Sequence, residues 1–221
     1  GLPSIKETID GIIEIAESKT IDIISIGPDQ IAQECFFNQE NICKELEGGG
    51  GVPLRNKEEL SYIYNSSRTG NYPLLRCYAG TNNLIEWGKM LKETINNAWG
   101  AIPIFWYSEL DGRSKRNLKN AIKENQDAIK WHADNNLPIE INDSHQWALR
   151  KTSDPIEVAS AYIAAYNAKH LGVKYYIQQL MMNVPPGVSP EMDIAKMMAK
   201  LEIISKLSDD NFHVLRVIRT G

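Results

Sequence analysis

The chain contains little of what several large protein classes require. Its 221 residues include only three cysteines, Cys35, Cys43 and Cys77, and none has C-x-x-C spacing. A disulfide framework or a structural zinc site is therefore not expected. We expect the three cysteines to be ordinary thiols that pack as small hydrophobic side chains. Because free thiols persist in a reducing compartment, we expect a cytoplasmic location.

The sequence also lacks an excess of basic charge, a long apolar run and several common catalytic motifs. The formal net charge is -4, which leaves no electrostatic footprint for nucleic acid. No apolar run approaches the roughly 20 residues that cross a bilayer, so no membrane partner is expected. The sequence has no G-x-G-x-x-G, no G-x-x-x-x-G-K-[ST] and no H-E-x-x-H. We therefore expect no phosphate loop of these types and no metal site.

What the sequence does contain is a repeated alternation of short apolar strands and amphipathic helices. With 43% apolar and 24% charged residues, it has the composition of one ordinary globular domain. The expected helices cover 4–18, 30–46, 56–66, 84–98, 115–134, 155–170 and 190–207, and the expected strands 21–26, 73–79, 101–107, 137–141, 173–180 and 212–218.

This alternation predicts an α/β fold with parallel strands, either an open doubly wound sheet or a barrel. Because no glycine-rich phosphate loop follows the first strand, we favour a TIM-type (β/α) barrel domain over residues 1–221. Six strands do not close the usual eight-stranded barrel, so its first and last strands are expected outside the chain. Unpaired edges would then favour association of the chain with itself.

The clearest candidate site lies where the strand 137–141 ends. Glu140 lies in the strand, Asn142 follows it, and Asp143 and His145 come directly after. A histidine beside carboxylates can act as a general acid or base, which makes Glu140, Asp143 and His145 the catalytic candidates. The plainer alternative is a loop histidine bonded to nearby backbone. A buried Glu140 needs a cationic partner, for which Arg76 and Arg216 are the candidates.

Other polar or aromatic side chains at strand ends are candidates for substrate binding, since barrels place their chemistry there. With Asn142 they are Arg76, Tyr78, Thr81, Tyr107, Gln178 and Arg216.

The order and spacing of segments resemble one known family. Asn71 to Thr81, read N-Y-P-L-L-R-C-Y-A-G-T, is similar to that family's strand N-L-P-L-Q-A-R-H-G-T, and the segments 48–53 and 99–102 correspond to two glycine-containing loops. On these grounds the chain resembles the catalytic barrel subunit of glutamate mutase (methylaspartate mutase), an adenosylcobalamin-dependent isomerase.

The resemblance implies a carbon-skeleton mutase whose substrate is a small polar acid. It also implies adenosylcobalamin carried by a separate domain or subunit, because Asp143 to Ala148 matches only part of the cobalamin signature D-x-H-x-x-G. Tyr78 stands where the family has a substrate-binding arginine, so glutamate itself is not the expected substrate. Arg76, on the same strand, and Tyr107 would contact the substrate instead.

Two other functions remain open. The first is a non-catalytic barrel that binds a small ligand or a protein partner. The absence of the family's substrate-binding arginine at Tyr78 favours this function. The second is a barrel lyase or aldolase, although no lysine lies at a strand tip: Lys174 is near a strand start.

Overall fold

A computed structural model describes residues 2–38, 40, 50–112 and 115–220. Contacts divide the chain into two compact units, residues 1–100 and 101–221, which are described separately. The described part contains eight helices and six strands.

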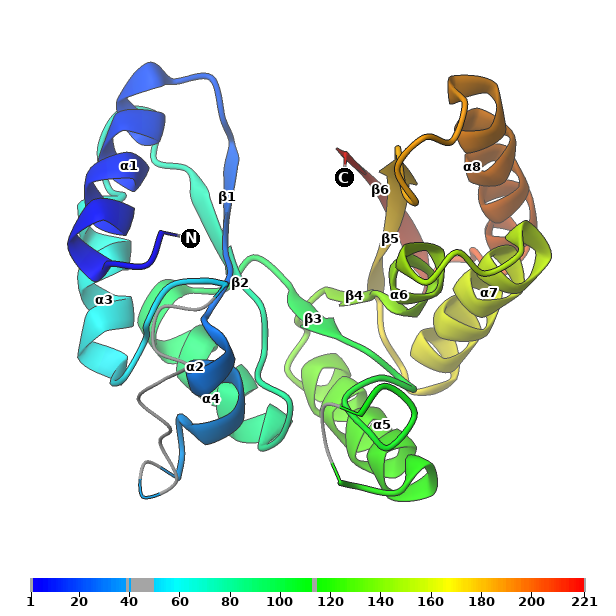
Figure 1. The fold of residues 1–221 in the computed structure, drawn as a ribbon, viewed down its shortest axis with the longest axis horizontal. Helices are drawn as coiled ribbons and strands as arrows, with labels where there is room; N and C mark the ends of the chain where they lie inside the picture. The colour runs from blue at the N-terminus through cyan, green and yellow to red at the C-terminus, as the bar shows by residue number, and fades with distance from the viewer. Residues whose placement is uncertain (1, 39, 41–49, 113–114, 221) are drawn as a thin grey trace. The chain divides into compact units, whose positions relative to one another are not determined.

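The first unit is built on two parallel strands. They are β1 (Ile23–Ile26) and β2 (Leu74–Cys77), in a register that pairs Ile23 with Leu74 and Ile26 with Cys77. Its helices are α1 (Ile5–Ser18), α2 (Gln30–Cys35), α3 (Lys57–Ser66) and α4 (Leu84–Ile95) (Figure 1). Asn56 and Glu59 begin α3 with a reciprocal capping box, as the polar start of the expected helix 56–66 suggests.

The second unit holds a four-stranded parallel sheet in sequence order. Its strands are β3 (Gly100–Ile102), β4 (Ile139–Ile141), β5 (Tyr175–Met182) and β6 (His213–Thr220). Its helices are α5 (Leu118–Asp134), α6 (Asp143–Leu149), α7 (Asp154–His170) and α8 (Pro190–Ser205). In Figure 1, α7 and α8 lie beside each other near β5.

Apolar burial holds this sheet in place. Ile139 of β4 is opposite Tyr176 of β5, both are fully buried, and the Tyr176 ring stacks on Phe212 with centroids 5.7 Å apart. On β6, by contrast, Leu215 and Ile218 are exposed. Self-association of the chain stays a prediction.

The α/β class with parallel strands is confirmed, whereas the described residues form two sheets and no closed barrel. The edge of β2 that faces away from β1 contacts the segment 97–98. There, Leu75 O accepts from Ala98 N at 2.8 Å, and Cys77 N donates to Asn97 Oδ1 at 2.9 Å. The segment 97–98 thus takes hydrogen bonds that a neighbouring strand would make.

Two expected elements differ from the structure. The strand predicted over 101–107 ends at Ile102, and α6 occupies what was expected to be a loop after β4. Within the expected helix 30–46, α2 ends at Cys35, while residues 39 and 41–49 lie outside the described residues. Among the helices that the structure describes, none is both long and apolar enough to cross a membrane.

Candidate functional site

Three polar side chains from adjacent strands share one face of the second unit's sheet. Glu140 of β4 is opposite Ile177 of β5, and Gln179 follows two residues later on β5. Gln179 is opposite Val217 of β6, and Arg219 again follows two residues later. Because side chains alternate along a strand, Glu140, Gln179 and Arg219 point to the same side.

The contacts among these residues link a buried carboxylate to a partly exposed arginine side chain. Glu140 is fully buried, and its Oε1 lies 3.8 Å from Nη1 of Arg219, whose side chain is 25% exposed. In the orientation that satisfies both neighbours, the Gln179 amide donates to Glu140 Oε1 at 2.9 Å and accepts from Arg219 Nη1 at 3.2 Å. Burial of Glu140 is thereby compensated, and the pair reaches solvent through the Arg219 side chain.

Unused polar atoms lie just beyond, where β4 ends and α6 begins. Asn142 Oδ1, Ser144 Oγ and His145 Nδ1 are buried, and none has a hydrogen-bond partner among the described residues. Buried polar atoms are normally paired, so such a group marks a place where a ligand or water could bind.

His145 is held in its neutral form. Burial lowers the pKa of its ring to about 4, and the positive charges of Arg219, Lys200 and Arg150 act in the same direction. At neutral pH the imidazole therefore offers one donor and one acceptor, with no charge of its own.

Asp143 lies in the same turn but makes different contacts. Its Oδ2 accepts from Ile104 N at 2.6 Å and its Oδ1 from Phe105 N at 3.0 Å. The side chain is fully buried, and this burial raises its pKa to about 7 against the opposing effect of the two N–H groups. Asp143 thus anchors the loop after β3, and direct contact with a substrate stays a prediction.

One of the two expected partners of Glu140, Arg216, was wrong. Arg216 is opposite Gln178 in the register, so it points to the other face of the sheet, and it is exposed. Arg76 belongs to the first unit, and its pairing with Glu140 stays a prediction. Arg219 takes this place because it lies on β6 at the same side-chain parity as Glu140.

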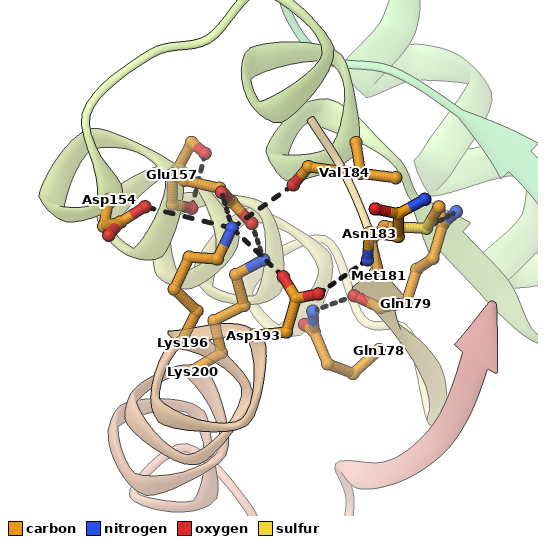
Figure 2. A network of polar contacts seen from close by, with 11 residues as sticks. Asp154, Glu157, Gln178, Gln179, Met181, Asn183, Val184, Asp193, Lys196 and Lys200 are labelled. Atoms are coloured by element: carbon orange, nitrogen blue, oxygen red, sulfur yellow. Dashed lines mark hydrogen bonds and ion pairs between the residues drawn. The ribbon is translucent and has the colours of Figure 1, made fainter. Parts of the chain in front are cut away.

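Gln178 lies on the face opposite Glu140. Its amide nitrogen donates to Gln179 O at 2.9 Å, while its Oε1 is buried without a hydrogen-bond partner in the described part of the chain. Figure 2 shows Gln178 near Asp193 of α8. Tyr107 is placed by a turn: its φ is +62°, its N donates to Asp111 Oδ2 at 3.3 Å, and its O accepts from Arg116 at 2.7 Å.

The candidates of the first unit form a group of their own. The fully buried Arg76 places its guanidinium 3.9 Å from the Tyr78 ring centroid and 5.4 Å from that of Trp99, and donates to Ser25 Oγ at 3.4 Å. Thr81 is buried, and its N donates to Gln33 O at 2.8 Å. Their role in substrate binding stays a prediction.

A second polar cluster in the second unit was missed by sequence reasoning. Lys196 Nζ lies 3.3 Å from Glu157 Oε2, 3.2 Å from Val184 O and 3.5 Å from Asp193 Oδ1 (Figure 2). Lys200 forms an ion pair with the other oxygen of Glu157. The spacing of the two lysines, four residues apart on α8, indicates that they share one face of the helix. Their common partner could not be predicted, because Glu157 is 39 residues away from Lys196 in the sequence.

Metal binding has no visible site in the described ranges, where no three His, Cys, Asp or Glu side chains are grouped to hold an ion.

Comparisons with known proteins identify no family. No family model matches the chain, and no curated protein matches it. Among solved structures, the arginine decarboxylase of Paramecium bursaria Chlorella virus is similar at 10% identity and a TM-score of 0.39. The match covers 97% of this chain and 62% of the decarboxylase, so the chain spans less than two thirds of that protein's length. A likeness this weak carries no functional argument.

The resemblance to glutamate mutase is therefore wrong, since the comparisons give no evidence of that family and the similar structure named above is of a different enzyme. The Gly-Thr pair that supported it has a local explanation. A Cβ on Gly80 would lie 2.1 Å from Trp87 Nε1 and 2.5 Å from Gln33 O, and Thr81 bonds to the same Gln33 carbonyl. Packing alone accounts for these two residues, and the adenosylcobalamin and mutase expectations lose the basis on which they rested.

Proposed function

We propose that the second unit binds a small polar carboxylic acid at the C-terminal ends of β4 to β6, with Arg219 as the group that holds the carboxylate. The single observation that supports this most is the position of Arg219. Its guanidinium is oriented by Glu140 and Gln179, and its side chain is still 25% exposed. The planar fork of an arginine matches a carboxylate in two-point contact.

The neighbouring polar atoms provide the selectivity such a site needs. Asn142 follows β4 directly as the residue before α6, and the charge of Arg219 acts on the His145 ring. Small-molecule sites combine a few polar groups with apolar walls. The buried atoms without a hydrogen-bond partner, Asn142 Oδ1, Ser144 Oγ and His145 Nδ1, can supply such polar groups.

Two forms of this function differ in the role of His145. In an enzyme, its neutral ring would exchange a proton with the bound acid. In a non-catalytic binding protein, it would only donate or accept a hydrogen bond. The low pKa of His145 favours the second form, because a ring with a pKa of about 4 is a weak base at neutral pH. Turnover of the bound acid separates the two.

The proposal is tested by calorimetric titration of the whole chain with acetate, succinate and L-malate, and with succinamide as the uncharged control. We expect binding of the carboxylates and none of succinamide. Arg219→Gln should weaken binding about tenfold or more, since a charge-assisted hydrogen bond is lost. The matched control is Arg216→Gln, three residues away on the same strand and exposed, which should bind as the unaltered chain does.

Arg219→Lys keeps the positive charge beside Glu140 and removes only the fork, so it covers the case in which Arg219→Gln does not fold. It should fold and bind more weakly. Carboxylate affinity that is the same in all these folded variants would refute the proposal.

A further inference from the structure

The loop that follows β3 is held to α6 by three successive contacts. Both oxygens of Asp143 accept from the loop, at Ile104 N and Phe105 N. The Trp106 ring packs edge-on against Trp147 of α6, with centroids 4.8 Å apart. The guanidinium of Arg150, at the C-cap of α6, lies 4.2 Å from the centroid of the Trp106 ring.

The same short helix carries part of the proposed ligand site. Ser144 and His145, whose polar atoms are unused, follow Asp143 directly in the first turn of α6. A shift of the loop would therefore pull on the turn that presents these two side chains. The loop is further tied to α5, since Asn125 donates to Ile104 O at 2.9 Å.

We infer that Asp143 is a positioning residue of the proposed site, whose carboxylate ties the loop backbone to the turn bearing Ser144 and His145, so that acid binding and loop docking strengthen each other. This inference rests on the proposed function for the identity of the ligand. The coupling of the loop to His145 does not depend on it.

The two hydrogen bonds between the loop and Asp143 depend on the charge of the Asp143 carboxylate. An ionised carboxylate accepts at both oxygens, whereas a protonated one turns an O–H toward an N–H donor and loses one bond. Tyr176 of β5 and Glu140 of β4 are the titratable groups near it on the sheet, and His145 and Arg150 belong to its own helix and its cap. Burial raises the pKa of Asp143 to about 7, so the tie should loosen as the pH falls below neutrality.

The first experiment needs no ligand and measures amide hydrogen exchange and the His145 ring resonances by NMR. Asp143→Asn should lower the protection of the Ile104 and Phe105 amides about tenfold at pH 8 and shift the His145 ring signals. The matched control is Asp111→Asn. Its carboxylate also accepts from two consecutive loop amides, Tyr107 N and Ser108 N, but lies on the loop itself. This control should leave Ile104, Phe105 and His145 unchanged.

A wild-type measurement covers the case in which Asp143→Asn does not fold. Protection of Ile104 and Phe105 should fall between pH 8 and pH 6, after correction for the intrinsic exchange rate. Equal protection at both pH values, or unchanged His145 signals in a folded Asp143→Asn variant, would overturn the inference.

The second experiment titrates succinate. Wild type at pH 8 should gain protection at Ile104 and Phe105 on binding, and Asp143→Asn should bind about tenfold more weakly. If wild type does not bind succinate or the other carboxylates, the proposed function fails while the ligand-free result stands. If wild type binds and folded Asp143→Asn binds equally well, the inference fails alone.

Discussion

The second unit buries two ionic clusters that differ in their access to solvent. In the cluster of Glu140, Gln179 and Arg219, the acid is fully buried but the Arg219 side chain is 25% exposed. In the cluster of Glu157, Lys196 and Lys200, the side chains are only 2 to 5% exposed. Both must offset the cost of removing charge from water. In the second cluster the charged side chain that reaches solvent is an acid, Asp154, which lies 3.9 Å from Lys196 and is 43% exposed. Only the first cluster therefore offers a partly exposed cation to a molecule from solution.

The closed cluster has its charges matched from within. Glu157 of α7 faces both lysines of α8, and Asp193 joins Lys196 to the backbone of Asn183, whose N–H it accepts at 2.6 Å. Such a cluster joins α7, α8 and the end of β5 in one arrangement. The comparison teaches that a cluster whose cations are all buried acts as a structural joint, whereas a partly exposed cation can also bind an anion from solution.

The largest expected effect is the loss of Glu157. Glu157→Gln removes the acid shared by two buried ammonium groups, and an unpaired buried charge costs about 3–5 kcal/mol. Burial already lowers the pKa of Lys200, and Glu157 opposes that shift. Urea unfolding should show the loss. Glu202→Gln is the control on α8, where an exposed pair with Lys206 at 4.0 Å should contribute less than about 1 kcal/mol. A similar loss in both variants would erase the distinction.

A smaller effect is expected at the open cluster. Glu140→Gln removes a buried charge together with its desolvation cost, and Arg219 keeps access to water. We expect a stability loss of about 1–2 kcal/mol in the same urea assay, below that of Glu157→Gln. A larger loss than at Glu157 would mean that the open cluster is the main structural joint.

The pH dependence of stability should separate two neighbours. The folded pKa of His145 is about 4, below its ordinary 6.5. Its contribution to stability is therefore fully present above pH 6.5 and is lost as the pH falls toward 4, on the order of 2 kcal/mol for a partly exposed ring. His145→Gln should remove this loss, measured by urea unfolding at pH 7 and pH 5.

Asp143 has the opposite sign. Its folded pKa of about 7 exceeds the ordinary 3.8, so the unfolded chain ionises first and stability falls as the pH rises from about 4 to 7. Asp143→Asn should remove that fall. Equal pH slopes in the two variants and the unaltered chain would contradict both assignments.

The smallest effect is expected at Arg216. Arg216→Gln changes an exposed side chain on the face opposite Glu140 and should alter stability by less than about 0.5 kcal/mol. Thermal unfolding of this variant beside Arg219→Gln tests the face assignment directly. A larger loss for Arg216→Gln would place the wrong arginine in the cluster.

Sequence reasoning predicted that Glu140 would be buried and would need an arginine, and this is confirmed. It did not find Arg219 and named Arg216, which faces the other side, because the side of a sheet that a residue faces relative to another strand depends on register, which local sequence does not contain. The strand predicted over 101–107 failed for a related reason. Its apolar residues are buried, but Ile104 and Phe105 bond to a carboxylate 38 or more residues away and not to a neighbouring strand.

The sequence alone determined the alternation of helices and parallel strands, because apolar periodicity and capping residues act over a few neighbours. It also placed Asn142, Asp143 and His145 together at the end of β4, since they are adjacent in the chain. Only the tertiary structure decided that Arg219 pairs with Glu140, that Asp143 holds the loop after β3, and that Glu157 lies between two lysines. These choices depend on strand register and helix packing between distant segments, which the folded chain sets as a whole.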